Sequence, residues 1–145
     1  MQIRPLARDD IPPWVALRAE LWPDQPLAEL DDEGRAALAA DPPLVVFVAA
    51  DDAALLGFIE LSLRSVAEGC ASSPVPYIEG WYVGEPARRR GVGGALMRAA
   101  ETWCRERGYT EFGSDARADN RLSRTVHAAL GFEEVEELVV FRKPL

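Results

Sequence analysis

The chain has 145 residues, of which 48% are hydrophobic and 28% charged, and its net charge is −8. A chain of this length can bury about 70% of the surface that its unfolded form exposes, so we expect one folded domain without a metal or disulfide scaffold. The negative charge repels polyanions, which argues against nucleic-acid binding and favours a cationic partner. The two cysteines and the single histidine form no metal-ligand cluster in the sequence, so no metal is expected.

The apolar runs are far shorter than the roughly 20 residues that a membrane-spanning helix requires. The segment from Met1 to Pro5 also lacks the apolar core of a signal peptide. We therefore expect a cytoplasmic protein that does not bind membranes, with Cys70 and Cys104 in the reduced form.

The spacing of apolar residues and the positions of glycine and proline predict a mixture of strands and helices. In chain order, the expected elements are a strand at 2–6, a helix from 9 or 10 to about 22, a helix at 27–39, strands at 44–50, 55–64 and 77–83, a helix at 91–107, a strand at 110–115, a helix at 120–130 and a strand at 132–142. This order predicts an α/β (α+β) fold, in which a central mixed sheet carries helices on its faces.

The run from Arg88 to Leu96, RRRGVGGAL, has the features of an anion-binding helix start. Glycine lets the backbone approach a ligand, and the first amides of a helix lack an intrahelical partner and lie at the positive end of its dipole. A pyrophosphate would fit there, with the arginines adding charge-assisted contacts. Two other phosphate motifs are excluded, because the run lacks GK[ST] and Leu96 stands where GxGxxG needs its third glycine. The alternative is a purely structural glycine-rich helix start with solvated arginines.

This run resembles the signature [RQ]xxGx[GA] of the GNAT superfamily of N-acetyltransferases, matched by Arg88, Gly91 and Gly93. The strand before it and the segment from Asn120 to Phe132 are similar as well, and the likeness extends over essentially the whole chain. It implies one domain over residues 1–145, a mostly antiparallel sheet, and acetyl-coenzyme A as co-substrate. The residues that it implies for coenzyme binding are Trp81, Tyr82, Val83, Arg88, Arg89, Arg90, Gly91, Val92, Gly93, Gly94 and Asn120.

Shorter motifs resemble the single-domain aminoglycoside 6'-N-acetyltransferases, among them LWP at 21–23, EGC at 68–70, IEG at 78–80 and the run at 126–134. This resemblance implies a homodimer and a small cationic amine, an aminoglycoside, as substrate. The substrate contacts that it implies come from Trp22, Val66, Glu79, Asp115 and Glu136. Val66 is a departure, because similar enzymes carry a tyrosine in this loop. A lost aromatic wall or hydroxyl would weaken sugar recognition without affecting acetyl transfer.

Glu79 is the first candidate for chemistry at the substrate amine. It lies in an otherwise apolar strand, on the face that we expect to carry Tyr77, Trp81 and Val83, where an unpaired carboxylate would be costly. It therefore needs a cationic partner, which is either the substrate or an arginine such as Arg64. In the functional interpretation, Glu79 takes the proton of the attacking amine through a water molecule.

Each other candidate also has a structural alternative. Asp115 ends a predicted strand, where ligands collect in open sheets, but its loop favours turns as well. Asn120 can cap the helix that follows it. His127 stands where many GNAT enzymes have a tyrosine that protonates the leaving thiolate, although it can also be a helix histidine packed on the sheet. Trp22 can be a core residue. Glu136 belongs to a cluster of glutamates, which is either a solvated segment or a group of charges that attracts a polycationic substrate.

These features together predict an enzyme that transfers an acetyl group from acetyl-coenzyme A directly to the 6'-amine of an aminoglycoside, which confers resistance to such antibiotics. The residues expected to take part in catalysis are Glu79, Asp115 and His127. Two alternatives stay open: a GNAT enzyme for another small-molecule or peptide amine, and a non-catalytic module that binds acyl-coenzyme A.

Overall fold

The computed structural model describes residues 1–52 and 54–145. Within these ranges four strands, β1 (Gln2–Pro5), β2 (Val45–Asp51), β3 (Ala54–Arg64) and β4 (Val75–Val83), pair in chain order into one antiparallel sheet. The helices are α1 (Ile11–Leu21), α2 (Leu27–Ala39), α3 (Val92–Glu106) and α4 (Arg121–Ala129). The predicted helices and the first four predicted strands are confirmed, with bounds that differ by a few residues at most.

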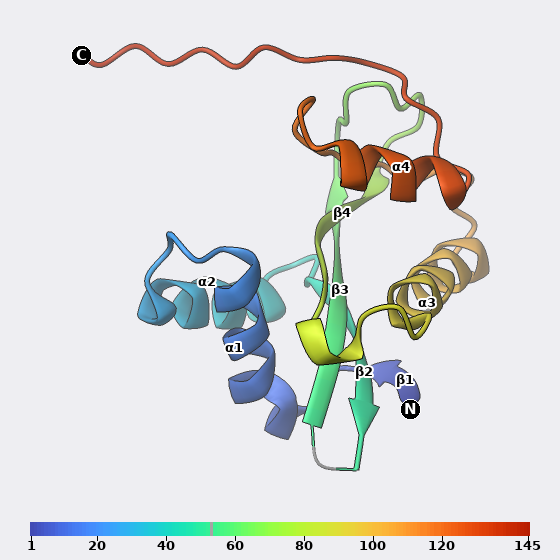
Figure 1. The fold of residues 1–145 in the computed structure, drawn as a ribbon. Helices are drawn as coiled ribbons and strands as arrows, with labels where there is room; N and C mark the ends of the chain where they lie inside the picture. The colour runs from blue at the N-terminus through green and yellow to red at the C-terminus, as the bar shows by residue number, and fades with distance from the viewer. Residues whose placement is uncertain (53) are drawn as a thin grey trace.

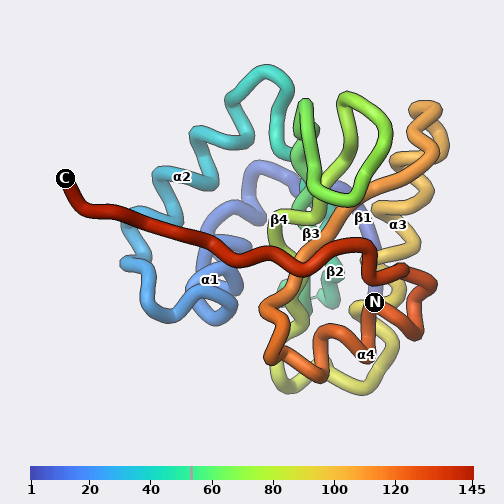
Figure 2. Tube along the Cα trace, turned by 90° about the horizontal axis from the view of Figure 1, so that it is seen from above, coloured from blue at the N-terminus to red at the C-terminus, as the bar shows by residue number. Residues whose placement is uncertain are grey.

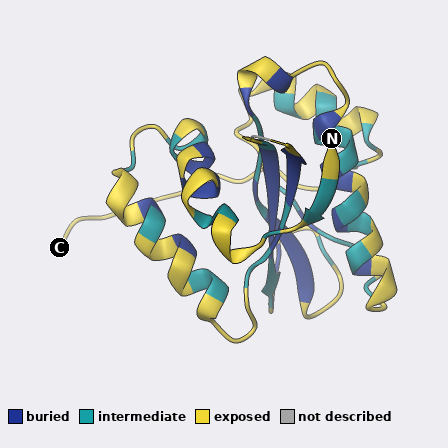
Figure 3. Cartoon of the chain, turned by 90° about the horizontal axis from the view of Figure 1, so that it is seen from below, coloured by how far each residue is buried: buried dark blue, intermediate teal, exposed yellow. Residues whose placement is uncertain are grey.

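The sheet separates two groups of helices (Figure 1). Helices α1 and α2 cover one face, where Trp14 and Phe58 are fully buried. Helix α3 covers the other face, where Ile59 and Leu96 are fully buried. The central strands are buried while the helices expose their outer sides (Figure 3). Neighbouring residues of β3 therefore belong to different cores, and both faces of this strand lie inside the protein.

Glycines end both helices of the second half of the chain. Gly108 follows α3 with φ of +81°, and Gly131 follows α4 with φ of +90°. This left-handed conformation is accessible to glycine at little cost and is common directly after a helix. None of the helices in the described ranges combines the length and the apolar character that crossing a bilayer requires.

Two predicted strands are absent from the structure of the single chain. Residues 110–115 form only one isolated parallel bridge, between Gly113 and Tyr77, and residues 132–142 join no sheet. The sheet is therefore antiparallel, and this bridge is the one parallel pairing among the described residues. Beyond α4 the chain runs in extended form and ends away from the body (Figures 1 and 2). A strand needs a neighbour for its backbone hydrogen bonds, and no described residue provides one for residues 133–145.

Candidate active site

The loop between β4 and α3 has the backbone geometry of an anion-binding helix start. Gly91 directly precedes α3 with φ of +76°, and Arg89 has φ of +63°. The Ala95 N–H donates to the Gly91 carbonyl at 3.1 Å and so begins the hydrogen-bond ladder of the helix. The amides before Ala95 lack intrahelical acceptors and lie at the positive end of a helix of 15 residues. This backbone can therefore hold a diphosphate.

The three consecutive arginines of this loop are not equivalent. Arg88 is held against β4, because its Nε donates to the Val83 carbonyl at 3.0 Å and its Nη2 to Tyr82 Oη at 3.3 Å. Arg89 and Arg90 are exposed. Arg88 therefore braces the loop on the strand, Arg90 Nη2 lies 3.9 Å from Asp51 Oδ2, and Arg89 presents its charge to solvent, where an anion can meet it.

Trp81 connects β4 to the first turn of α3. Its indole N–H donates to the Gly93 carbonyl at 3.2 Å, and a Cβ at Gly93 would lie 3.4 Å from the ring. Trp81 and Val83 pack on the α3 side of the sheet. Tyr82 lies on the opposite side, where its hydroxyl donates to Glu20 at 2.9 Å. The strand end thus lies directly beside the helix start, with Trp81 and Val83 facing α3.

A β-bulge in β4 determines where Glu79 points. The pairing of β3 with β4 skips Glu79, which is therefore an extra residue in the strand. Its carboxylate turns to the side of Ser62 and Arg64, whereas Trp81 and Val83 lie on the α3 side. The expectation that Glu79 shares a face with Trp81 and Val83 is wrong, because the alternation of side chains is interrupted at a bulge.

Arg64 and Ser62 hold the Glu79 carboxylate. The Nε and Nη2 groups of Arg64 donate to its two oxygens at 2.8 Å each, and the Ser62 hydroxyl donates to Oε1. Burial acts to raise the pKa of Glu79, but the hydrogen bonds from Arg64 and Ser62 outweigh it, so the pKa lies below its usual value. The structural alternative for Glu79, an ion pair with Arg64, is therefore confirmed, and its contact with a substrate stays a prediction. Glu79 is ionised at neutral pH and fixed in one orientation, as a group that binds a cation must be.

Tyr77 brings Asp115 to the same group. Its hydroxyl donates to Asp115 Oδ2 at 2.7 Å, and the guanidinium carbon of Arg64 lies 3.6 Å from the centroid of its ring. Burial, followed by the hydrogen bond to Asp115, raises the pKa of Tyr77, so the hydroxyl stays protonated as a donor. Asp115 lies in an exposed loop rather than at the end of a strand. A chain of contacts thus connects Glu79 with Asp115: Arg64 pairs with Glu79 and packs on the ring of Tyr77, and the Tyr77 hydroxyl donates to Asp115.

His127 lies on α4, half-buried between two aromatic rings. Its ring centroid is 5.7 Å from that of Trp81 and 5.0 Å from that of Phe132. Its Nδ1 is 2.7 Å from the Ser123 carbonyl oxygen, and its Nε2 is 2.8 Å from Ser114 Oγ. A neutral ring protonated on Nδ1 fits both contacts, because Nδ1 then donates and Nε2 accepts. These contacts support the alternative of a packed helix histidine.

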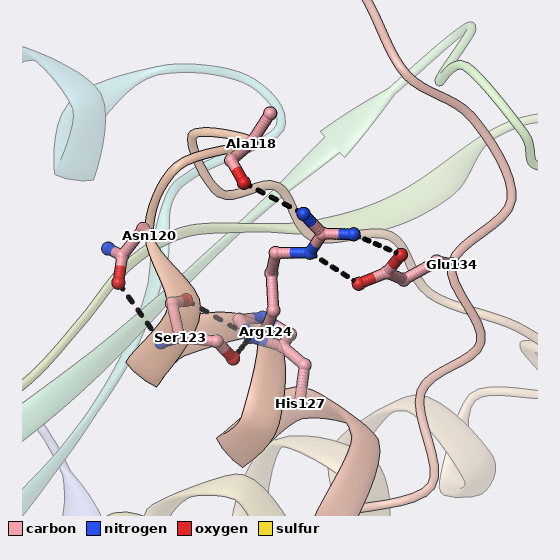
Figure 4. Close-up of polar contacts among 6 residues, drawn as sticks. All are labelled: Ala118, Asn120, Ser123, Arg124, His127 and Glu134. Carbon is pink, nitrogen blue, oxygen red and sulfur yellow. Dashed lines mark hydrogen bonds and ion pairs between the residues drawn. The ribbon is translucent and has the colours of Figure 1, made fainter.

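Asn120 caps α4, because its Oδ1 accepts from the Ser123 N–H at 3.0 Å (Figure 4). The capping alternative is therefore confirmed, and the predicted coenzyme contact of Asn120 stays a prediction. One turn later Arg124 joins the helix to the segment that follows it, with Nε and Nη2 donating to Glu134 at 2.7 and 2.9 Å. The Arg124 Nη1 donates to the Ala118 carbonyl at 2.8 Å as well (Figure 4).

The other predicted substrate residues differ in their surroundings. Trp22 is half-buried at the end of α1. Val66 is 77% exposed in the loop after β3, and Glu136 is exposed beyond α4. Val135 packs on Gly69, since a Cβ at Gly69 would lie 2.1 Å from its Cγ2. The segment that carries Glu136 therefore contacts the loop that carries Val66. The side chains of Glu136 and Val66 themselves face solvent.

The structure contains a buried ion pair beside Trp22 that was not predicted from the sequence. Arg18 and Glu60 are only 7% and 2% exposed, and the Arg18 Nη1 donates to Glu60 Oε1 at 2.6 Å. A signal for it exists in the sequence, because Trp14, Arg18 and Trp22 recur every four residues and so lie on one side of a helix.

A cleft of about 420 Å³ lies apart from Glu79, between the end of α3 and the segments 109–114 and 130–135. Its apolar walls include Phe112, Leu130 and Phe132, and neither Glu79 nor Trp22 lines it.

Comparison with known proteins identifies the family. The model of the acetyltransferase (GNAT) family matches residues 7–132. The aminoglycoside N(6')-acetyltransferase type 1 of Klebsiella aerogenes is 47% identical over 146 aligned positions, which cover 99% of this chain and 96% of the relative. A protein of the same name from Salmonella typhimurium (strain LT2) is 39% identical, with 99% of both chains covered.

Solved structures share the fold over nearly the whole chain. AAC(6')-Iy in complex with the bisubstrate analog CoA-S-monomethyl-acetylneamine has a TM-score of 0.90 and 37% identity, covering 99% of this chain and 98% of that chain. AAC(6')-Iy in complex with CoA has a TM-score of 0.91 and 37% identity, covering 99% and 95%. The predicted fold class and enzyme class are confirmed. The family match and the identities above 30% over the full length show that this chain belongs to the GNAT family of acetyltransferases.

Proposed function

We propose that this protein transfers the acetyl group of acetyl-coenzyme A to the 6'-amine of an aminoglycoside and so confers resistance to such antibiotics. One observation carries the proposal. The strand β4 presents the ionised Glu79 at its bulge, and two residues later Trp81 is bonded to the first turn of α3. A cation-binding group thus lies on β4, and an anion-binding backbone follows at the start of α3, which suits a cationic acceptor and an anionic coenzyme. The names of the relatives support the choice of acceptor.

The coenzyme would bind along the end of β4 and the start of α3. The backbone amides of residues 89–94 would hold the pyrophosphate, and residues 81–83 would line the pantetheine arm, with Asn120 as a further contact. Exposed Arg89 and Arg90 would add charge at the rim. Binding both substrates in one orientation can supply roughly 7 to 11 kcal/mol of the barrier, which makes positioning the main contribution of the protein.

The acceptor amine has to lose a proton before it attacks the thioester. An alkylamine with a pKa near 10.4 costs roughly 4 to 5 kcal/mol to present as the neutral base at pH 7, and amino sugars cost less. Ionised Glu79 and the nearby Asp115 would bind the ammonium form, and Glu79 would then receive the proton through water. Because hydrogen bonds hold the pKa of Glu79 low, the proton transfer relies on the approach of the thioester rather than on a strong base.

His127 would complete the reaction by returning a proton to the coenzyme thiolate. Its ring lies against Trp81, on the strand that would line the pantetheine arm. To supply this proton, the ring would first have to carry one on Nε2 as well as on Nδ1; Nε2 would then give its proton to the thiolate through Ser114 Oγ, which leaves the ring neutral.

We further propose that the enzyme is a homodimer in the cytoplasm, where acetyl-coenzyme A is available. The support is the segment Leu138 to Phe141, whose four apolar side chains are 65 to 89% exposed in the single chain. A run that is apolar on both sides of an extended chain is typical of an internal strand, and exposed in water it would promote association. In the dimer, a second copy would cover this segment, with residues 110–115 as its strand neighbour. Glu136, which precedes the segment, would then lie at the surface shared by the two copies.

The alternative acceptor is another small-molecule or peptide amine, which the exposed Val66 favours because it lacks the aromatic ring of similar enzymes. Release of free coenzyme thiol from acetyl-coenzyme A, measured with kanamycin A, spermidine and a short peptide, separates the two. We expect the highest kcat/KM with kanamycin A. Release with spermidine or the peptide alone would favour the alternative, and coenzyme binding without release on any amine would indicate a non-catalytic module.

A further inference from the structure

The side of α1 that meets the sheet carries an arginine between two tryptophans. Trp14 and Arg18 lie one helical turn apart, and Trp22 lies one turn further. The Trp22 N–H donates to the Arg18 carbonyl at 2.8 Å, so the helical bonding pattern extends to this residue. The backbone of α1 therefore fixes the relative positions of the three side chains.

A single carboxylate oxygen fixes the guanidinium of Arg18. Glu60 Oε1 accepts from Arg18 Nη1 at 2.6 Å and from Trp14 Nε1 at 3.0 Å. Both charged residues are more than nine-tenths buried. A buried ion pair of this kind is costly to break from one side, because the remaining charge loses its partner.

The guanidinium also packs against both indole rings. Its central carbon lies 4.9 Å from the ring centroid of Trp14 and 4.9 Å from that of Trp22, within the range of cation–π contacts. The Arg18 Nε is buried and has no hydrogen-bond partner in the described part of the chain. The guanidinium is therefore held by its ion pair with Glu60 and by its flat surface against the rings, and a lysine ammonium could supply only the first of these contacts.

The edge of the Trp22 ring lies against β4. A Cβ at Gly80 would lie 2.9 Å from Trp22 Cη2 and 3.1 Å from Glu60 Oε2, so only glycine leaves room for the indole. Gly80 directly follows Glu79 in the strand. Trp22 is thus confined between Arg18 and the strand that carries the proposed acceptor-binding carboxylate.

We propose that Arg18 is a positioning residue that holds Trp22 as a rigid wall of the acceptor pocket and thereby determines affinity for the amine substrate. The inference rests on the proposed function, which supplies the acceptor. Arg18 contacts Glu60 and the two indoles, all of them away from the first turn of α3, so its effect falls on acceptor binding and not on the coenzyme.

The test is the conservative variant Arg18→Lys, which keeps a cation for Glu60 and removes the flat guanidinium from Trp22. We expect the KM for kanamycin A to rise about tenfold, with kcat and the KM for acetyl-coenzyme A within about twofold of the parent enzyme. The melting temperature should stay close to that of the parent. Arg4→Lys is the matched control, because Arg4 is also ion-paired, with Asp10, but has no indole stacked on it, and it should leave every parameter unchanged.

A second measurement does not depend on turnover. The indole N–H signal of Trp22 in the NMR spectrum, assigned through Trp22→Phe, should shift or broaden in Arg18→Lys and stay unchanged in Arg4→Lys. An unchanged KM for kanamycin A or an unchanged Trp22 signal would overturn the positioning role, as would an equal rise in the KM for acetyl-coenzyme A. If the parent enzyme does not acetylate kanamycin A, the proposed function fails, and the Trp22 signal alone decides whether Arg18 positions this ring.

Discussion

In the proposed mechanism the Glu79 carboxylate would attract an ammonium ion and later accept its proton, and these two tasks oppose each other. A carboxylate that binds the ammonium strongly also stabilises its charged form. Arg64 reduces this conflict, because its bidentate bond neutralises part of the charge on Glu79 and fixes both oxygens. The lowered pKa of Glu79 means that it stays ionised from pH 6 to 9. Any change of rate in this range therefore comes from another group, and the substrate amine is the first candidate.

The variant Glu79→Gln tests this role. We expect kcat at saturating substrates to fall about 100-fold, as is common when a general base is removed, at every pH from 6 to 9. The parent enzyme should gain activity with rising pH as the amine deprotonates. Asp31→Asn is a suitable control, since Asp31 is paired with Arg35 on the outside of α2. Turnover by Glu79→Gln that equals that of the parent across this range would exclude the base.

Glu60 makes the stability of the protein depend on pH in an unusual direction. Burial, which outweighs the ion pair with Arg18, raises its pKa from 4.5 to about 7. Between these values the native state holds a proton that the unfolded chain has lost, so the contribution of Glu60 to the unfolding free energy is full below pH 4.5 and declines as the pH rises to about 7.

Urea unfolding of the parent and of Glu60→Gln, whose amide mimics the protonated acid, measures this contribution. The difference in unfolding free energy, parent minus variant, should decrease between pH 5 and pH 8 by an amount on the order of 3 kcal/mol. A difference that is constant or increases over this interval would contradict the raised pKa.

At the scale of elements, the sequence predicted the helices well because glycine or proline stands near the ends of each, and α3 also has a clear apolar side. It also predicted the loop before α3, because glycine readily adopts the positive φ that Gly91 has at this position. The direction of Glu79 was not predictable, because a bulge depends on how two strands pair and not on one strand alone. The ion pair of Arg18 with Glu60 was missed for a similar reason, since its partners are 42 residues apart.

Helix α3 offers a matched pair of substitutions for the coenzyme site. Gly91 and Gly108 flank it with φ of +76° and +81°, and both have open space where a Cβ would lie. Alanine at either position should cost about 1 kcal/mol of stability through its left-handed backbone. Only Gly91→Ala disturbs the amides proposed to bind the pyrophosphate, so its Kd for acetyl-coenzyme A should rise about fivefold or more, equivalent to about 1 kcal/mol.

Calorimetric titration of both variants with acetyl-coenzyme A provides the comparison. Equal affinities in Gly91→Ala and Gly108→Ala would place the coenzyme elsewhere.

At the scale of the whole molecule, the two predicted strands that the single chain does not form differ: residues 110–115 make one bridge to β4, and residues 132–142 pair with no strand among the described residues. The apolar run from Leu138 to Phe141 and the loose segment 110–115 both lie outside the sheet, and the cleft lined by Phe112 and Phe132 lies beside the second of them. In the proposed dimer, a second molecule would supply a strand neighbour for these segments, which no pattern within one chain specifies.

Substitution of the apolar segment tests the proposed dimer. The double variant with Val139→Asp and Phe141→Asp places two charges in the surface that a second copy would cover. Burying these unpaired charges costs more free energy than an interface of this kind provides. We expect the parent to sediment as a dimer and this variant as a monomer in analytical ultracentrifugation. Leu122→Asp, at an apolar residue of α4 that is 75% exposed, should remain a dimer. A parent protein that is monomeric at micromolar concentration would refute the dimer.

The most direct test of the central claim is the position of the acetyl group in the product. Kanamycin A would be incubated with the enzyme and carbon-13-labelled acetyl-coenzyme A, and the product analysed by NMR. The proposed function, with the coenzyme at the start of α3 and the acceptor amine at Glu79, predicts one labelled amide, on the 6' nitrogen. A label on another nitrogen, or unmodified kanamycin A beside intact acetyl-coenzyme A, would contradict the account.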